Sequence, residues 1–246
     1  MECKGCGGTL DSGMHFCPSC GETAHPHRLD LKHILHEFIH AFLHADKGIF
    51  LLVKQLAQDP GLTALSYVNG SRKKYFNPVS FLLITGGLAF FLRYKLAVEV
   101  PAGSKKMTFF IAEFMHRYST PIIVLTVPVL SLYSWLFFKS TGKNYAENMV
   151  MNLYMMGEYH LFSIICLVIP AAFFPRAGAA LTGVSMLVMA VYFYFTCKNF
   201  FQQKNLVTLL KIISIQLLYF LTTAIIMGIS LIAFFIMSGL HVKDLR

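Results

Sequence analysis

The sequence predicts an all-α polytopic membrane protein with about five transmembrane helices, a small N-terminal zinc ribbon and interfacial amphipathic helices. Of its 246 residues, 56% are hydrophobic and 13% are charged, whereas a soluble domain carries about 25% charged residues. Two C-x2-C pairs lie near the N-terminus, and long apolar stretches begin after residue 77. These features divide the chain into a ribbon over 1–25, amphipathic helices over 26–76 and a transmembrane domain over 77–246.

The N-terminal cysteines have the spacing of a metal site, because Cys3 and Cys6 are followed by Cys17 and Cys20. Two turns of this kind can surround one tetrahedral Zn²⁺ with four thiolates, which leaves no open coordination position. The segment is too short to bury a hydrophobic core, so metal binding would supply most of its folding free energy. We therefore predict structural zinc as the cofactor. Redox dithiol chemistry is the alternative, but no thioredoxin-like βαβ pattern flanks either pair.

Residues 29–45 form a predicted amphipathic helix that is rich in histidine. His33, His36, His40 and His44 are spaced so that they share one face of this helix. The face has three interpretations: a second transition-metal site, a pH-responsive surface, because histidine titrates near pH 6.5, or the solvated polar side of an interfacial helix. We favour the third interpretation.

A basic cluster of Arg72, Lys73 and Lys74 precedes the first apolar stretch. Basic residues on this flank favour a cytoplasmic N-terminus, and they also attract anionic lipid headgroups. We favour the role in topology over specific lipid recognition. Tyr75 and Phe76 follow the cluster, and aromatic side chains of this kind favour the membrane–water interface.

The transmembrane domain is predicted to contain five spans, each close to the roughly 20 residues that cross a bilayer. They cover about 78–98, 120–138, 159–174, 177–197 and 212–237. Pro128 should kink the second span. Two shorter helices, one on each side of residues 59–61, are expected to lie on the cytoplasmic membrane surface.

The distribution of charge leaves the orientation of these spans undecided, because eight basic residues flank the spans on each side. The reducing environment that the thiolates need and the basic flank of the first span both favour a cytoplasmic N-terminus. We therefore predict a multi-pass protein of the bacterial inner (cytoplasmic) membrane.

One candidate for chemistry within the membrane precedes the third span. Glu147, Tyr154 and Glu158 fall on one face of a helix over 143–158 and would line a proton or cation path if that helix entered the membrane. The alternative, which we favour, is that this segment lies in the interface with Glu147 toward water. Carboxylates three helical turns apart, about 16 Å, cannot act together on one bond.

The sequence also argues against catalysis and against nucleic-acid binding. It contains no Ser-His-Asp order, no glycine-rich phosphate loop and no HExxH motif, so we expect no enzymatic activity. The net charge is +9, but the basic residues flank apolar stretches instead of forming a continuous basic face. We therefore expect membrane lipids, and a protein at the cytoplasmic face, as partners.

The order of these motifs resembles a bacterial, Bacteroidetes-type family of uncharacterised multi-span membrane proteins with an N-terminal zinc ribbon. The similar segments are the C-x2-C pairs, FIHAFLHADKGIF, DPGLTALSYVNGSRKKYFNPVSFLL and NYAENMVMNLYMMGEYH. The resemblance implies a multi-span membrane protein without an established activity. More loosely, the architecture is similar to that of Yip1-like membrane proteins, which implies a role in membrane organisation or trafficking.

Together these observations predict a non-enzymatic scaffold or regulatory module with a cytoplasmic structural zinc site. The alternative is a small ion or metal transporter that uses the histidine face and the face of Glu147 and Glu158. The two hypotheses differ in whether the polar groups at membrane depth line a path.

Overall fold

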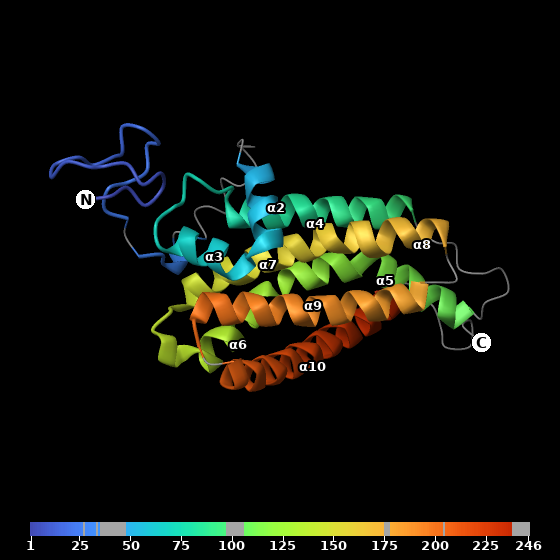
Figure 1. Ribbon diagram of the computed structural model, residues 1–246. Helices are drawn as coiled ribbons and strands as arrows, with labels where there is room; N and C mark the ends of the chain where they lie inside the picture. Colours follow the sequence, from blue (N-terminus) through green and yellow to red (C-terminus); the bar gives the residue numbers. More distant parts are fainter. Residues whose placement is uncertain are drawn as a thin grey trace.

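The structure is a computed structural model in which the helices lie side by side in one elongated bundle (Figure 1). It describes residues 1–26, 28–32, 34, 48–96, 106–174, 178–203 and 205–237. In these ranges the secondary structure is helical apart from two isolated β-bridges near the N-terminus. The cysteine-rich segment lies at one end of the bundle, and the last described helix ends at the other (Figure 1).

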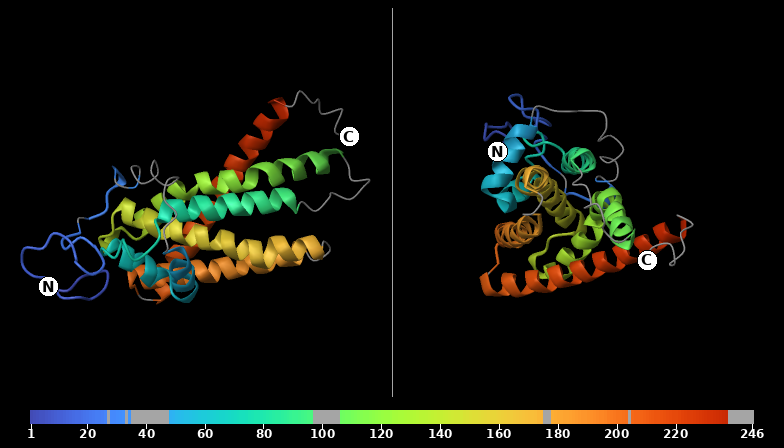
Figure 2. Two further views of the ribbon diagram at one scale, coloured as in Figure 1. Left: turned by 90° about the horizontal axis from the view of Figure 1, so that it is seen from above. Right: turned by 90° about the vertical axis from the view of Figure 1, so that its right-hand side faces the viewer.

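The helices are α2 (Ile49–Gln58), α3 (Pro60–Val68), α4 (Pro78–Lys95), α5 (Lys106–Leu125), α6 (Val127–Phe137), η1 (Lys139–Thr141), α7 (Tyr145–Ser163), η2 (Ile164–Val168), α8 (Ile169–Phe173), α9 (Gly178–Phe201) and α10 (Asn205–Met237). Helix α7 contacts α2, α3, α4, α6 and α9, so it forms the centre of the bundle. Figure 2 shows α10 inclined to the other helices.

Within the described residues, four helical stretches are long and apolar enough to cross a membrane. They are Arg117–Phe137, Tyr145–Val168, Ala180–Phe201 and Leu206–Met237. This finding supports the predicted class, but it is one fewer than the five expected spans. The predicted span that is not among the four is α4. This helix has 18 residues and carries Arg93 and Lys95 in its last turn. The predicted span extended to residue 98, and the described helix stops three residues earlier.

The third predicted span begins much earlier than the sequence indicated. We expected 159–174, whereas α7 starts at Tyr145 and continues through the π-helical turn η2 into α8. The reason is that polar side chains of α7 are buried against α6. Asn152 is fully buried, and its Nδ2 donates to the hydroxyls of Ser131 at 3.3 Å and Ser134 at 3.0 Å. Hydrogen bonds between helices let a polar segment lie inside a bundle.

The second predicted span is interrupted close to Pro128, where the sequence predicted a kink. Helix α5 ends at Leu125, α6 begins at Val127, and Pro128 occupies the first turn of α6. Proline lacks the N–H that would continue the helical hydrogen bonds. Thr126, between the two helices, is buried, and its hydroxyl lies 2.8 Å from that of Tyr219 in α10.

The two short helices pack into the bundle and do not simply rest beside it. Asp59 caps α3 by accepting a hydrogen bond from the N–H of Leu62 at 2.9 Å, and Pro60 is the first helical residue. Leu52 and Leu56 of α2 are fully buried. Helix α3 contacts both α7 and α9.

The aromatic residues of the segment before α4 are covered by protein, whereas the sequence suggested side chains that face the membrane–water interface. Tyr75 is 7% exposed and Phe76 is 3% exposed. The hydroxyl of Tyr154 in α7 donates to the carbonyl of Phe76 at 2.6 Å. The ring of Tyr67 in α3 packs edge-on against the ring of Tyr154, with 5.5 Å between the two centroids. This segment is therefore held by α3 and α7.

Gly61 sets the distance between α3 and α9. A Cβ atom there would lie 2.5 Å from the carbonyl oxygen of Thr196 and 2.8 Å from the backbone nitrogen of Phe200. Backbone atoms of a long helix cannot move aside individually. Any side chain at this position therefore separates the two helices.

We predict that Gly61→Ala lowers the free energy of unfolding by about 1–3 kcal/mol, the usual effect of overpacking. The matched control is Gly183→Ala in α9, where a Cβ meets nothing within 4 Å. Alanine there should leave the stability unchanged or raise it by up to about 1 kcal/mol. Thermal unfolding in detergent, followed by circular dichroism, measures both variants. Equal melting temperatures for the two would contradict the close contact.

Candidate metal centre and its contacts with the bundle

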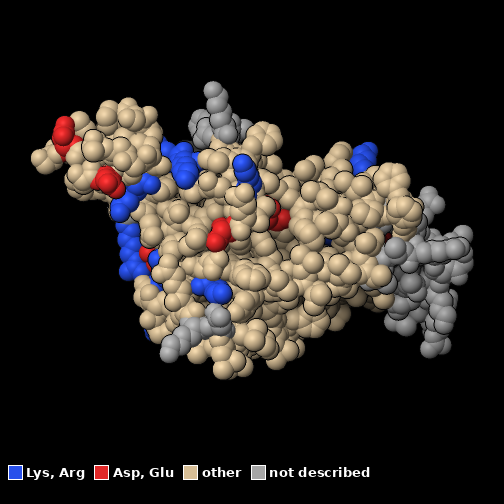
Figure 3. All heavy atoms as spheres, in the orientation of Figure 1, with Lys and Arg blue, Asp and Glu red and all other residues tan. Residues whose placement is uncertain are grey.

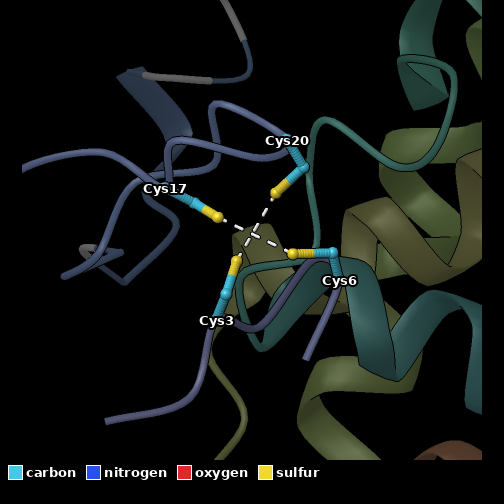
Figure 4. A group of neighbouring side chains, drawn as sticks. All are labelled: Cys3, Cys6, Cys17 and Cys20. Atoms are coloured by element: carbon cyan, nitrogen blue, oxygen red, sulfur yellow. Dashed lines mark hydrogen bonds between the residues drawn. The ribbon is translucent and has the colours of Figure 1, made fainter. Parts of the chain in front are cut away.

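Cys3, Cys6, Cys17 and Cys20 form a single cluster, as the spacing predicted. Their four Sγ atoms all lie within 4.8 Å of one another. The Sγ atoms of Cys3 and Cys20 are 3.5 Å apart, and those of Cys6 and Cys17 are 3.6 Å apart. Figure 4 shows the four sulfur atoms pointing toward a common centre.

The cluster is built from two similar hairpins. A β-bridge joins Glu2 to Thr9 in the first, and another joins Phe16 to Thr23 in the second. The second bridge repeats the first after 14 residues: Phe16 corresponds to Glu2, and Thr23 corresponds to Thr9. The spacing of the two C-x2-C pairs therefore reflects a repeated backbone unit.

Each hairpin closes through a glycine with positive φ. The N–H of Gly7 donates to the carbonyl of Cys3 at 2.9 Å, and the N–H of Gly21 donates to that of Cys17 at 2.8 Å. Their φ angles are +76° and +70°. Only glycine adopts this conformation without a steric penalty, so the glycine after each cysteine pair is needed to turn the chain around the sulfur atoms.

The sulfur positions fit a tetrahedral metal ion. Zinc–sulfur bonds of about 2.3 Å imply sulfur–sulfur distances of about 3.8 Å, close to the separations in the cluster. Hydrogen bonds, first that of the Cys20 backbone N–H, lower the pKa of Cys17 to about 6, while the pKa of Cys20 is raised to about 12 by burial and the neighbouring thiols. Backbone N–H groups directed at sulfur favour the thiolate, which is the form that binds metal. The four cysteines can therefore hold a metal ion.

The ribbon (residues 1–25) is attached to the segment before α4, here called the hinge (residues 69–76). The carboxylate of Glu22 accepts a hydrogen bond from the backbone N–H of Lys73 at 2.8 Å, and Glu22 is 2% exposed. Its own carbonyl accepts from the N–H of Cys17 at 2.8 Å. One residue thus joins the second cysteine hairpin to the hinge. Ser71 adds a hydrogen bond from its hydroxyl to the carbonyl of Lys4.

A second attachment joins the chain after the ribbon to the start of α7. Arg28 donates from Nε to Oε1 of Glu147 at 2.9 Å and from Nη2 to Oε2 at 3.0 Å. The Glu147 side chain is only 7% exposed. This ion pair raises the pKa of Arg28. The expectation that Glu147 faces water is therefore wrong, because Arg28 covers and neutralises it.

The same carboxylate caps helix α7. Oε2 of Glu147 accepts from the N–H of Asn144 at 2.8 Å, and the side chain of Asn144 accepts from the N–H of Glu147 at 2.8 Å. The amide of Asn144 also donates to the carbonyl of Leu29 at 2.8 Å. We call this group of Arg28, Leu29, Asn144 and Glu147 the α7 clamp. The Asn-x-x-Glu pattern is a capping signal that the sequence contains, but the contact with Arg28 could not be inferred from it.

The three residues of the predicted polar path have different surroundings in the structure. Glu147 belongs to the α7 clamp, and Tyr154 is fully buried with its hydroxyl bonded to the carbonyl of Phe76. Glu158 instead lines a cavity of about 170 Å³. Two of the three side chains therefore serve packing within the protein.

The remaining predicted site residues fall into two groups. His33, His36, His40 and His44 lie outside the described residues. In the basic cluster, Lys73 and Lys74 are exposed and Arg72 is half-buried. Figure 3 shows lysine and arginine side chains gathered on the end of the bundle beside the ribbon, while few appear along its side. The charge is thus concentrated at the end of the bundle beside the ribbon.

A family model described as "Protein of unknown function (DUF3667)" matches residues 46–90. No curated protein and no solved structure matches the chain. The matched segment contains α2, α3, the hinge and most of α4. It therefore covers the part of the bundle that carries the ribbon. The similarity supports the resemblance to an uncharacterised family over this segment, and nothing found supports the Bacteroidetes source or the likeness to Yip1-like proteins.

We predict that the purified chain binds one metal ion per molecule and that Cys17→Ser abolishes this binding, because three thiolates and a hydroxyl form a much weaker site. Cys166→Ser is the matched control, since Cys166 lies in η2 within the bundle. Elemental analysis of the purified variants gives the stoichiometry. Metal retained by Cys17→Ser would refute the site, and a second equivalent would indicate ligands outside the described residues.

Proposed function

We propose that this protein is a non-enzymatic membrane scaffold or regulatory module whose binding surface is the zinc-held ribbon seated on the end of the bundle. The observation that carries the proposal is the attachment of a four-cysteine cluster to two points of the bundle, through Glu22 and the α7 clamp. A four-thiolate site has no open position for a substrate, so its metal maintains shape.

Exposed groups on the ribbon and hinge support a protein or lipid partner there. Phe16 is 60% exposed, and the Nζ atom of Lys73 lies 6.0 Å from the centre of its ring. Lys74 is also exposed and lies over Tyr75. An aromatic side chain beside cationic groups suits a protein interface, and the lysines also suit anionic lipid headgroups.

For the membrane domain we propose five spans, with the N-terminus in the cytoplasm of a bacterial cell. Helix α4 is the fifth member, because it lies along α7 within the same bundle (Figure 1). The cytoplasm supplies the reducing conditions that keep thiolates available for a metal ion.

This topology predicts that alkaline phosphatase fused after Arg246 is active, because the enzyme folds only outside the cytoplasm and five spans place the C-terminus there. A fusion at Gly142, in the exposed loop before α7, should be inactive. Phosphatase assays on whole cells compare the two fusions. An inactive C-terminal fusion would exclude either the cytoplasmic N-terminus or the fifth span.

The scaffold itself predicts metal-dependent association with other membrane components. Cross-linking in native membranes followed by quantitative mass spectrometry should recover a set of associated proteins that Cys17→Ser loses and Cys166→Ser keeps. An unchanged set in Cys17→Ser would contradict the proposal.

The transporter hypothesis has a test of its own. Ion flux into proteoliposomes that disappears in Glu158→Gln would favour a transporter. Among the described residues, the cavity beside Glu158 is the feature that supports this hypothesis.

A further inference from the structure

The carboxylates of α7 differ in how their oxygen atoms are used. Both oxygens of Glu147 are bonded to Arg28, and one also accepts from Asn144. In contrast, Oε2 of Glu158 is buried and has no hydrogen-bond partner among the described residues. No lysine or arginine of the described chain forms an ion pair with Glu158. A buried polar atom without a partner costs free energy, so it needs a functional or structural explanation.

Glu158 lies in the interior of a candidate membrane span. It is thirteen residues after Tyr145, about 20 Å along the helix, and ten residues before Val168, about 15 Å from the other end. Its cavity is about 170 Å³ in volume and is lined by side chains of α2, α7 and α9. An ionisable group at this depth is expensive and is usually retained for binding or transport.

A second and larger cavity adjoins the first, because Tyr159 and Met189 line both. It measures about 440 Å³, within the usual range for small-molecule sites. Its lining includes six methionines, Met115, Met155, Met156, Met186, Met189 and Met227. Methionine side chains are flexible and polarisable, so such a lining adapts to apolar groups of varied shape.

The chemistry of the two cavities identifies the class of ligand. The smaller one offers a single carboxylate beside the rings of Tyr159 and Tyr192. The hydroxyl of Tyr192 is already directed at the carbonyl of Leu56 at 3.3 Å. A bare divalent cation needs about six oxygen ligands, which this lining does not provide. An organic ammonium group needs only one counter-charge and gains from neighbouring aromatic rings.

We propose that the adjoining cavities bind an amphiphilic amine, with its cationic nitrogen against Glu158 and its apolar body among the methionines of α5, α7, α9 and α10. The carboxylate provides the charge selectivity, and the larger cavity provides most of the contact area. This site is separate from the metal cluster and does not depend on the scaffold function.

The test uses the full-length, metal-loaded protein, delipidated in dodecyl maltoside. Radiolabelled dodecyltrimethylammonium and dodecanol share one alkyl chain and differ in charge. We expect the wild-type protein to bind the cationic probe at least tenfold more tightly than the neutral one, and Glu158→Gln to bring the two affinities within about twofold of each other. Glu113→Gln is the matched control, because Glu113 is exposed on α5, and it should keep the wild-type preference.

Two results would overturn the proposal: equal binding of both probes by the wild-type protein, or a cationic preference that survives in Glu158→Gln. Val188→Phe provides a second variant should Glu158→Gln fail to fold, since it narrows the smaller cavity without changing charge. It should weaken binding of the cationic probe at least fivefold, and unchanged binding would also overturn the site. Competition by phosphatidylethanolamine would assign the ligand to a lipid headgroup, and its failure would assign it to a free amine.

Discussion

The ion pair between Arg28 and Glu147 is the contact on which the arrangement of this protein depends most. Glu147 lies at the first turn of the central helix, where its carboxylate also completes a capping box with Asn144. Negative charge at a helix N-terminus is favourable, but a nearly buried carboxylate needs a counter-charge. Arg28 supplies that charge from the chain that follows the ribbon, 119 residues earlier. The start of α7 and the position of the ribbon are thereby linked in one interaction.

The ribbon is also attached to the bundle through Glu22, which binds the hinge. Its backbone closes the second cysteine hairpin and its carboxylate binds the hinge at Lys73. A metal ion held by the four cysteines would order this hairpin and so keep Glu22 in place. The ribbon, whose own buried cluster consists of Cys3, Leu10 and Cys17, is thus attached to the larger bundle. The family model that matches the chain covers the hinge and the helices around it, which is the surface that receives the ribbon.

The interior of the bundle combines two solutions for polar groups at membrane depth. The Nδ2 of Asn152 donates to Ser131 and Ser134 of α6 and so joins two helices, while its Oδ1 has no hydrogen-bond partner among the described residues. Glu158 has a buried oxygen without a protein partner and opens into a cavity. The second solution leaves a charge available to a ligand, since no described basic side chain occupies its site.

The helical class, the four-cysteine site and the break near Pro128 could be predicted from the sequence, because each depends on local spacing or on one residue's covalent geometry. The sequence could not show that α7 begins at Tyr145, since Asn152 counts as polar until its partners on α6 are known. It also could not place Tyr75 and Phe76, which resemble interfacial aromatics but are covered by α3 and α7. The pairing of Arg28 with Glu147 and the cavity around Glu158 arise from residues far apart in the chain. Only the tertiary structure decided them, because burial and partners are properties of packing and not of residue type.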